Sequence, residues 1–394
     1  MPSVVRALYF IAIGAMICIP VLFKRTARPI YPAVWVFAGY ASFISILLAP
    51  DVATIVDNLF VGAQLILLLG VGAFALTYNC LNDPDFASRL AIAFLIGQSL
   101  SAFVALAQQM GHSILVPATL AHGRSLGLAE HQNSLGLMAC LAILIALQIL
   151  LVGRKFRPLI LAALAVNVLA LIASGSLTAV MGLVVGFIVL VVCMRGYLAK
   201  TLVWGTVLAA AAWLVASAIG VLDHLPSLSE RYRQVTGQAK GVSSWEVRRQ
   251  TYDFAWSRIT EDPLFGRGLN IQSSGTFNGI TQVHNALIRA WYQGGIFLGV
   301  AFALIVIAIV IVVFQALIRK ENGIEASILV AVLVFVSLSA VLEQREFWLP
   351  ILVAWASISA TTITKKMSIN QVGDPRLPVP ARHSQGEEPL GIQG

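Results

Sequence analysis

The sequence predicts an all-α polytopic membrane protein, with about eleven or twelve transmembrane helices and one large outer loop that contains a short amphipathic helix. Hydrophobic residues make up 58% of the 394 residues, and charged residues only 11%. Charged residues approach a quarter of an average soluble domain, so the chain is far from that class. Apolar stretches of about 18 or more residues recur, and each could cross the hydrocarbon core of a bilayer as a helix.

We predict eleven membrane spans, because a helix satisfies its own backbone hydrogen bonds in lipid and these stretches are too long and uniform for barrel strands. They are expected at residues 3–23, 31–49, 55–77, 89–109, 133–152, 158–173, 177–194, 201–221, 286–318, 324–342 and 347–364. The first lacks a small-residue cleavage site, which favours a span over a signal peptide. The ninth is too long for a simple crossing, so its first turns are expected at or above the outer surface.

The chain therefore divides into four parts. Residues 1–222 contain the first eight spans, residues 223–285 form the large outer (periplasmic) loop, and residues 286–364 contain the last three spans. The tail, residues 365–394, is rich in proline, glycine and charge, and is predicted to be disordered.

The distribution of lysine and arginine predicts the orientation of the helices. One set of loops and the tail hold fifteen basic residues, whereas the opposite short loops hold only Arg6, Arg124 and Arg345. Loops rich in lysine and arginine stay in the cytoplasm, so we expect the C-terminus inside and the large loop outside. The net charge of +8 is explained by anchoring at anionic membrane lipid, and no nucleic-acid partner is expected.

The large loop is predicted to contain a helix that ends before Pro263. Ser243 and Glu246 fit a capping box at its start. Aromatic and apolar residues recur at helical spacing along one face, at Trp245, Tyr252, Trp256 and Ile259. By itself, such a helix could be an anchor at the membrane interface, with its aromatic rings among the headgroups. The Gly266-x-Gly268 pattern that follows predicts a tight turn.

His284 and Asn285 stand where the large loop becomes the ninth span, and Arg289 follows one turn later. A histidine can take up a proton near neutral pH, and an arginine can hold phosphate oxygens through two parallel hydrogen bonds. A charge inside a span is costly and usually faces a cavity or a partner, which makes Arg289 informative. The simpler alternative for His284 is an interfacial histidine at a helix start.

Shorter outer loops add further polar residues. One contains His122, Arg124 and the run 130–133, another is the run 174–178, and a third is the run 343–346. Each also has an ordinary explanation: helix capping, a turn of small residues, or surface charges that pair with arginines. These loops contain no DxD, HExxH or Cys/His spacing typical of a metal site, and the chain has no Walker motif, so we expect neither metal nor cofactor.

The order of these motifs resembles the O-antigen ligase/polymerase superfamily, and in particular its exopolysaccharide polymerase branch. That family often shows Arg-x3-Trp-x2-Ala, then Pro-Leu-x-Gly-x-Gly, then His-Asn at a helix start. The matching residues here are Arg248, Tyr252, Ala255, Pro263, Leu264, Gly266, Gly268, His284 and Asn285, followed by Gly294 and Gly295. Residues 127–136 and 174–179 look like the Gly-x3-His-Lys-Asn-x-Leu-Gly and Ser-Gly-Ser-Lys-Thr-Ala motifs of exopolysaccharide polymerases.

The resemblance implies a metal-independent glycosyltransferase that acts on polyprenyl-diphosphate-linked sugars at the outer face of a bacterial inner membrane. In that family a loop histidine is proposed as general base, and outer arginines hold the diphosphate. Carried over by position, His284 is the general base and Arg248 a diphosphate ligand, with Arg124, Arg267 and Arg289 as further candidates. The supporting residues are Asn285, His131, Asn133, Ser176 and Thr178.

Three positions depart from the family pattern. Tyr252 stands where tryptophan is common, Gln132 where lysine is frequent, and Leu177 where lysine or arginine is usual. The last two departures remove positive charge from the expected diphosphate site. Other arginines of the large loop or of the ninth span must then compensate, or the substrate or the activity differs.

We therefore expect a polymerase that joins lipid-linked repeat units into exopolysaccharide or O-antigen. Its partners would be the polyprenyl-diphosphate-linked glycan donor, a glycan or lipid-linked acceptor, membrane lipid and a chain-length regulator. Ligation of a finished glycan to the lipid A core is the enzymatic alternative, because both reactions use the same donor. A transporter or flippase is the alternative from another class, and its only hints are Asp57, Gln98, Gln108 and Gln109.

Overall fold

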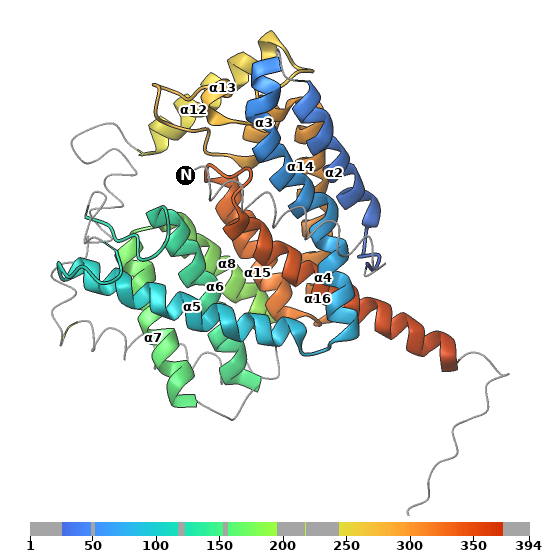
Figure 1. Ribbon diagram of the computed structural model, residues 1–394. Helices are drawn as coiled ribbons and strands as arrows, with labels where there is room; N and C mark the ends of the chain where they lie inside the picture. Colours follow the sequence, from blue (N-terminus) through green and yellow to red (C-terminus); the bar gives the residue numbers. More distant parts are fainter. Residues whose placement is uncertain are drawn as a thin grey trace, which may run out of the picture.

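The computed structural model describes residues 26–48, 52–116, 123–152, 157–194 and 244–372, together with the single residue 217. Within these residues the regular secondary structure is helical, apart from one isolated β-bridge between Phe277 and Thr281 (Figure 1). The prediction of an all-α fold is therefore confirmed.

The helices follow the predicted spans closely. In chain order they are α2 (Pro32–Leu47), α3 (Val52–Leu65), η1 (Ile66–Gly72), α4 (Ala73–Asn82), α5 (Phe86–Gln109), α6 (Gln132–Val152), α7 (Arg157–Ser174), α8 (Leu177–Cys193), α12 (Ser244–Glu261), α13 (Ile271–Ser274), α14 (Ala286–Arg319), α15 (Gly323–Ser337) and α16 (Arg345–Val372). In the described part, six helical stretches are long and apolar enough to cross a membrane, and α2, α8 and α15 are shorter apolar helices. The predicted spans 3–23 and 201–221 lie outside the described residues, Ser217 excepted, so the total of eleven stays a prediction.

The third predicted span, 55–77, is longer in the structure. Helices α3, η1 and α4 follow one another without a break from Val52 to Asn82, and η1 is a π-helix. Gly39 of α2 faces Gly70 of η1 so closely that a Cβ at Gly39 would lie 2.7 Å from the Cα of Gly70. Small residues allow such an approach between the backbones of membrane helices, which explains the tight packing of α2 on η1.

Helix α15 joins two groups of helices. In the first group α5, α6, α7 and α8 pack together, and in the second α14 packs on α2 while α16 packs on α4. Helix α15 contacts α6 and α8 on one side and α14 and α16 on the other (Figure 1). Gly182 of α8 faces α15, where a Cβ would lie 2.9 Å from the carbonyl oxygen of Ala331. Glycine is therefore required for this contact.

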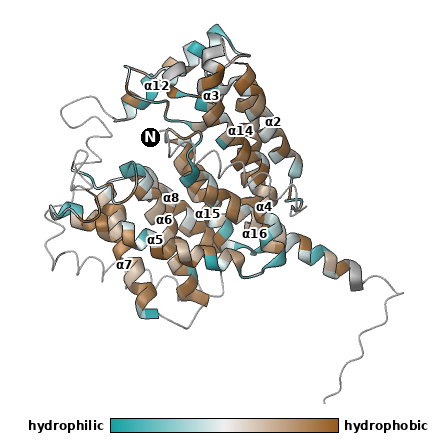
Figure 2. Ribbon diagram, viewed as in Figure 1, coloured by the Kyte–Doolittle hydropathy of each residue, from teal (hydrophilic) through white to brown (hydrophobic). Residues whose placement is uncertain are grey.

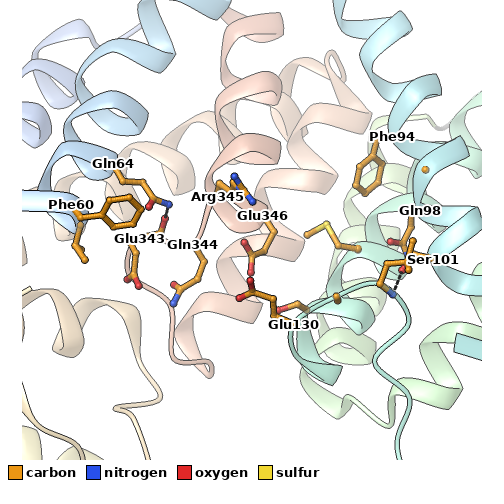
Figure 3. A pocket seen from close by; sticks show the side chains of 16 residues that line it. Phe60, Gln64, Phe94, Gln98, Ser101, Glu130, Glu343, Gln344, Arg345 and Glu346 are labelled. Carbon is orange, nitrogen blue, oxygen red and sulfur yellow. Dashed lines mark hydrogen bonds between the residues drawn. The ribbon is translucent and has the colours of Figure 1, made fainter. Parts of the chain in front are cut away.

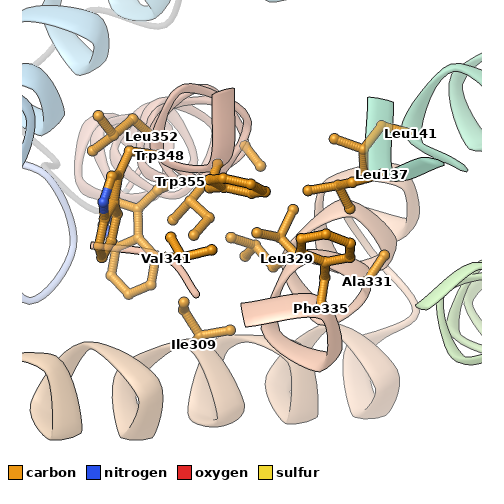
Figure 4. Close-up of a cluster of buried hydrophobic side chains, with 14 of the residues drawn as sticks. Leu137, Leu141, Ile309, Leu329, Ala331, Phe335, Val341, Trp348, Leu352 and Trp355 are labelled. Atoms are coloured by element: carbon orange, nitrogen blue, oxygen red, sulfur yellow. The ribbon is translucent and has the colours of Figure 1, made fainter. Parts of the chain in front are cut away.

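An apolar core lies where α6, α14, α15 and α16 meet (Figure 4). Phe335 of α15 stacks on Phe347 of α16 with ring centroids 5.3 Å apart, and Phe302 of α14 meets the ring of Trp348 edge-on at 5.2 Å. Lipid tails are as apolar as these side chains, so close packing, more than removal from water, holds the helices together.

Charged residues are concentrated at the helix ends and in the large loop, whereas some helices bury amides along their length, such as Gln98 and Asn167. Figure 2 shows hydrophobic residues along α2, α5, α7 and α14, and many hydrophilic residues on α12. The last helix, α16, continues to Val372, past the predicted end of the last span at 364. The rest of the predicted tail, residues 373–394, lies outside the described residues.

Candidate functional site

The long helix α14 is broken near its start, at Gly295, where φ is 78° and the backbone is not helical. The turn that follows α12 fills this break. The backbone N–H groups of Arg267 and Gly268 donate hydrogen bonds to the carbonyl oxygens of Tyr292 and Gln293, at 3.0 Å each. The turn thus satisfies carbonyl groups that the break in the helix leaves without intrahelical partners.

Glycine is necessary on both sides of this junction. A Cβ at Gly266 would collide with the carbonyl oxygen of Gln293, and Gly295 has a positive φ that other residues rarely adopt. The hydroxyl of Ser45 in α2 donates to the carbonyl oxygen of Gly294 at 2.6 Å. The Gly-x-Gly pattern and the later Gly-Gly pair therefore form one structural unit, and the break explains the excess length of the ninth predicted span.

Helix α12 confirms the predicted helix of the large loop and packs against the first turns of α14. Tyr252, Ala255 and Ile259 face inward, and the hydroxyl of Tyr252 donates to the carbonyl oxygen of His284 at 3.0 Å. Trp245 and Trp256 of the predicted face are 54% and 52% exposed, so only part of that face is buried against the protein. The buried face follows the smaller Ala255, because α12 lies close to α14 along that side.

Asn285 caps α14 and fixes the position of His284. Its Oδ1 accepts a hydrogen bond from the N–H of Ile288 at 3.0 Å, and its Nδ2 donates to the carbonyl oxygen of Ser337 at 3.1 Å. The cap satisfies one of the free N–H groups of the first helical turn. The second bond ties this turn to the end of α15, which gives Asn285 a positioning role.

The surroundings of His284 keep its imidazole neutral near pH 7. Burial, the positive charge of Arg248 and smaller contributions from His131 and Arg289 together lower the pKa of His284 to about 4. The backbone carbonyl of Gln282 opposes these effects. A neutral imidazole can accept a proton, so the environment leaves His284 in the form that a general base needs.

The fold therefore gathers predicted residues from separate segments around His284. Arg248 comes from α12, His131 from the segment before α6, and Arg289 from the second turn of α14, and the charge of each acts on His284. The pKa of His131 is also lowered, first by burial and then by the charge of Arg124. His122, the other histidine predicted in this outer loop, lies outside the described residues.

Arg289 is 1% exposed and has protein partners on each side. Its Nε donates to Oε1 of Gln293 at 2.7 Å, its Nη1 donates to the carbonyl oxygen of Ala340 at 3.0 Å, and its Nη2 lies 3.7 Å from Oε2 of Glu343. The expected pairing of the 343–346 run with an arginine thus occurs with Arg289. This arginine anchors the segment between α15 and α16.

Arg124 joins three of the predicted polar segments. It is 6% exposed, its Nε donates to the carbonyl oxygen of Ser174 at 2.5 Å, and its Nη2 donates to Oδ1 of Asn133 at 2.6 Å. Ser176 caps α8 by accepting from the N–H of Ala179 at 3.4 Å. These contacts give Arg124, Asn133 and Ser176 structural roles near His131.

The remaining predicted residues lie apart from His284. Arg267 forms an ion pair with Glu261 at 2.7 Å, beside the turn that fills the break in α14. Thr178 is buried in the first turn of α8. Within the described residues, neither side chain forms a hydrogen bond or ion pair with His284, and their support of substrate binding stays a prediction.

A cavity of about 610 Å³ opens beside the residues that act on His284 (Figure 3). It is lined by α3, by α5, by the segment 128–134 and by the run 343–346, and Glu343 connects it to Arg289. The sequence indicated polar clusters at 130–133 and 343–346, but it did not show that Glu130 and Glu346 face a common space. Within the described residues, no group of three or more histidine, cysteine, aspartate or glutamate side chains could hold a metal ion.

Comparison with known proteins finds one family model that matches part of the chain. Residues 160–303 match the family model described as O-antigen ligase. The matched segment includes α12, the turn at Gly266, His284 and the break at Gly295, which are the features that form the site. No curated protein matches the chain. This match, and the motifs that it contains, support the resemblance to the O-antigen ligase/polymerase superfamily.

Proposed function

We propose that the protein is a membrane glycosyltransferase of the bacterial inner membrane, which polymerises polyprenyl-diphosphate-linked repeat units into exopolysaccharide or O-antigen at the outer face. The observation that carries this proposal is that His284 is half-buried and neutral, with a pKa that the charge of Arg248 helps to lower. A proton acceptor and a guanidinium that acts on it electrostatically are the two groups that sugar transfer from a diphosphate requires.

In the proposed step, a hydroxyl oxygen of the acceptor sugar attacks the anomeric carbon of the donor sugar. The bond between that carbon and the diphosphate oxygen breaks, and the hydroxyl proton goes to His284. Nδ1 of His284 is buried and has no hydrogen-bond partner among the described residues, so it is available for this proton. Arg248 binds the departing diphosphate and stabilises its negative charge. The anomeric configuration inverts, because no covalent sugar–enzyme intermediate forms.

The same charges couple donor binding to the strength of the base. Arg248 contributes to the low pKa of His284, so a diphosphate bound at Arg248 would offset that effect. The pKa of His284 then rises when the donor is in place. The imidazole becomes a stronger base at the stage at which the acceptor hydroxyl must lose its proton.

A narrow apolar groove supports a lipid-linked donor. It starts at Asn285, next to His284, and has a volume of about 120 Å³. Apolar side chains of α14, α15 and α16 line it, including Leu287, Ile305, Val336 and Trp348. A prenyl chain in this groove would place its diphosphate beside His284 and Arg248.

Ligation of a finished glycan to the lipid A core remains the second candidate, because the matching family model is described as O-antigen ligase. Cells that lack the protein separate the two reactions. Loss of a polymerase leaves single lipid-linked repeat units, whereas loss of a ligase leaves long unattached chains. A chain-length regulator is a proposed partner only in the first case.

Transport is less well supported by the contacts. Gln108 bonds the backbone of residues 126 and 127, and Gln109 donates to the carbonyl oxygens of Gly123 and Ala173. These glutamines, which hinted at a transport path, hold loops in place. The break in α14 is also filled by protein, so it does not form the open ion site of a transporter.

The test is sugar transfer by the purified full-length protein from a polyprenyl-diphosphate oligosaccharide. His284→Ala should abolish product formation while the protein stays folded, and His112→Ala, an exposed histidine away from the site, is the matched control. Full activity of His284→Ala would remove His284 as the base. Movement of the intact lipid-linked glycan across the bilayer, without new glycosidic bonds, would replace transfer by transport.

A further inference from the structure

The cavity beside the site has the size of a small-molecule site and a lining of mixed polarity. Its volume of about 610 Å³ lies within the range of about 300–1,000 Å³ typical of ligand pockets. Phe60 and Phe94 supply aromatic rings on opposite sides, and Gln64, Gln98 and Gln344 supply amides (Figure 3). Aromatic rings can pack against C–H groups of a ligand, and amides can bond its hydroxyl groups, so the lining suits a ligand that carries both.

One amide in this lining lacks a partner. Gln98 of α5 is only 7% exposed, and its Nε2 has no hydrogen-bond partner among the described residues. Its side chain lines the cavity, beside Ser101 (Figure 3). A buried donor without a partner destabilises the protein, so a ligand oxygen in the cavity would remove that cost.

The titratable groups of the lining are mostly acidic. The carboxylates of Glu130 and Glu346 point toward each other across the cavity, and Glu343 stands on the other side (Figure 3). Arg345 is the one basic residue of the lining that the structure describes. Carboxylates accept strong hydrogen bonds from hydroxyl and amine groups and repel anions. The diphosphate therefore belongs at Arg248 and not in this cavity.

We infer that this cavity binds a sugar residue of the glycan substrate, and that it selects sugars that are rich in hydroxyl groups and carry no negative charge. The inference rests on the proposed function and deepens it. Sugar hydroxyls donate to Glu130 and Glu346 and accept from Gln98. A uronic acid would bring a third carboxylate against these two, so acidic sugars are excluded.

The cavity is placed to deliver that sugar to the reacting centre. Glu130 immediately precedes His131, whose charge acts on His284. On the other side, Glu343 lies 3.7 Å from Arg289, which also acts on His284. The acidic cavity and the basic site thus adjoin each other at these residues. The neutral sugar would bind on the acidic side and the diphosphate on the basic side.

The experiment measures sugar binding without turnover, on the full-length protein in lipid nanodiscs. Maltotriose, chitotriose and mannotriose form the neutral panel, and trigalacturonate is the acidic probe. Binding is followed by saturation-transfer NMR and calorimetry. At least one neutral trisaccharide should bind, and Gln98→Leu should weaken it roughly 10-fold, because a buried hydrogen bond is lost.

Variants that remove the negative charges of the cavity are expected to gain binding of an acidic sugar, a result that misfolding cannot produce. The double variant Glu130→Gln, Glu346→Gln should bind trigalacturonate, which the unmodified protein excludes, because the repulsion is removed while the shape is kept. Glu321→Gln is the matched control, since Glu321 pairs with Lys365 on the surface away from this cavity. Binding of trigalacturonate by the unmodified protein, or failure of every neutral sugar to bind, would overturn the inference.

Transfer assays distinguish this inference from the proposed function. If the cavity variants leave KM unchanged for both substrates while His284→Ala abolishes transfer, the sugar site is wrong and the proposed reaction stands. If the neutral sugars bind as expected but no transfer occurs from any diphosphate donor, the reaction is wrong and the cavity remains a sugar site. A raised KM for the acceptor assigns the bound sugar to the acceptor, and a raised KM for the donor assigns it to the donor.

Discussion

The hydroxyl of Tyr252 donates a hydrogen bond to the backbone carbonyl of His284 at 3.0 Å. This bond connects the helix of the large loop directly to the residue that we propose as general base. It also explains how a tyrosine can serve at a position where the resembled family commonly has tryptophan. Both side chains carry an N–H or O–H donor on an aromatic body, so both could hold the carbonyl.

Removing this hydrogen bond should make the position of His284 less well defined while the imidazole itself stays in place. We expect Tyr252→Phe to lower kcat/KM for transfer about 3- to 10-fold, which corresponds to the loss of one hydrogen bond of about 0.5–1.5 kcal/mol. Tyr252→Trp should retain more activity than Tyr252→Phe. Steady-state kinetics with the lipid-linked donor measure both, and equal activities of all three proteins would show that the bond does not position His284.

The pH dependence of transfer should reflect the low pKa of His284. Because that pKa is lowered to about 4 in the folded protein, the neutral base persists as the pH falls from 7 and is lost only near pH 4. Arg248→Gln removes one of the charges that lower the pKa, so the acid limb of its residual activity should move to higher pH. An acid limb that stays in place in Arg248→Gln would contradict the coupling of these residues.

Donor binding should also shift the acid limb of the pH profile of transfer. The profile of kcat/KM reports the free enzyme, whereas that of kcat reports the complex. If the diphosphate offsets the charge of Arg248, the acid limb of kcat lies at higher pH than that of kcat/KM. Coincident limbs in the two profiles would place the diphosphate away from Arg248.

The shape of the guanidinium should matter as well as its charge. Arg248→Lys keeps the charge but loses the planar fork that binds phosphate oxygens in pairs, so turnover should fall strongly. Arg249→Lys, at the exposed neighbouring position, is the matched control and should change little. Unchanged donor affinity in Arg248→Lys, measured by binding of the polyprenyl diphosphate, would remove Arg248 from the diphosphate site.

The turn in the break of α14 should be sensitive to a single methyl group. In Gly266→Ala the new Cβ meets the carbonyl oxygen of Gln293, so the turn must shift, at a cost of roughly 1–3 kcal/mol. Gly97→Ala places a Cβ where nothing lies within 4 Å and should leave stability nearly unchanged. Thermal unfolding in detergent compares the two, and equal melting temperatures would show that the junction tolerates the shift.

Much of the fold and part of the site could be predicted from the sequence. Uniform apolar stretches predicted the positions of helices such as α6 and α14, because the period and length of a membrane helix are set by the bilayer. The order Arg248, Gly266, His284 and Gly295 predicted the local elements of the site, because capping, turns and helix starts depend on neighbouring residues. The face on which α12 packs could not be predicted, since it depends on the shape of α14.

The sequence by itself determined an all-helical membrane protein with a polar loop that carries a histidine, several arginines and a glycine turn. Only the tertiary structure decided which of these arginines act on His284 and which bond elsewhere in the protein. Arg248 and Arg289 both lower the pKa of His284, and Arg289 also pairs with Glu343, whereas Arg124 holds Ser174 and Asn133. The physical reason is that burial and charge pairing depend on distances between segments far apart in the chain, and no local pattern encodes those distances.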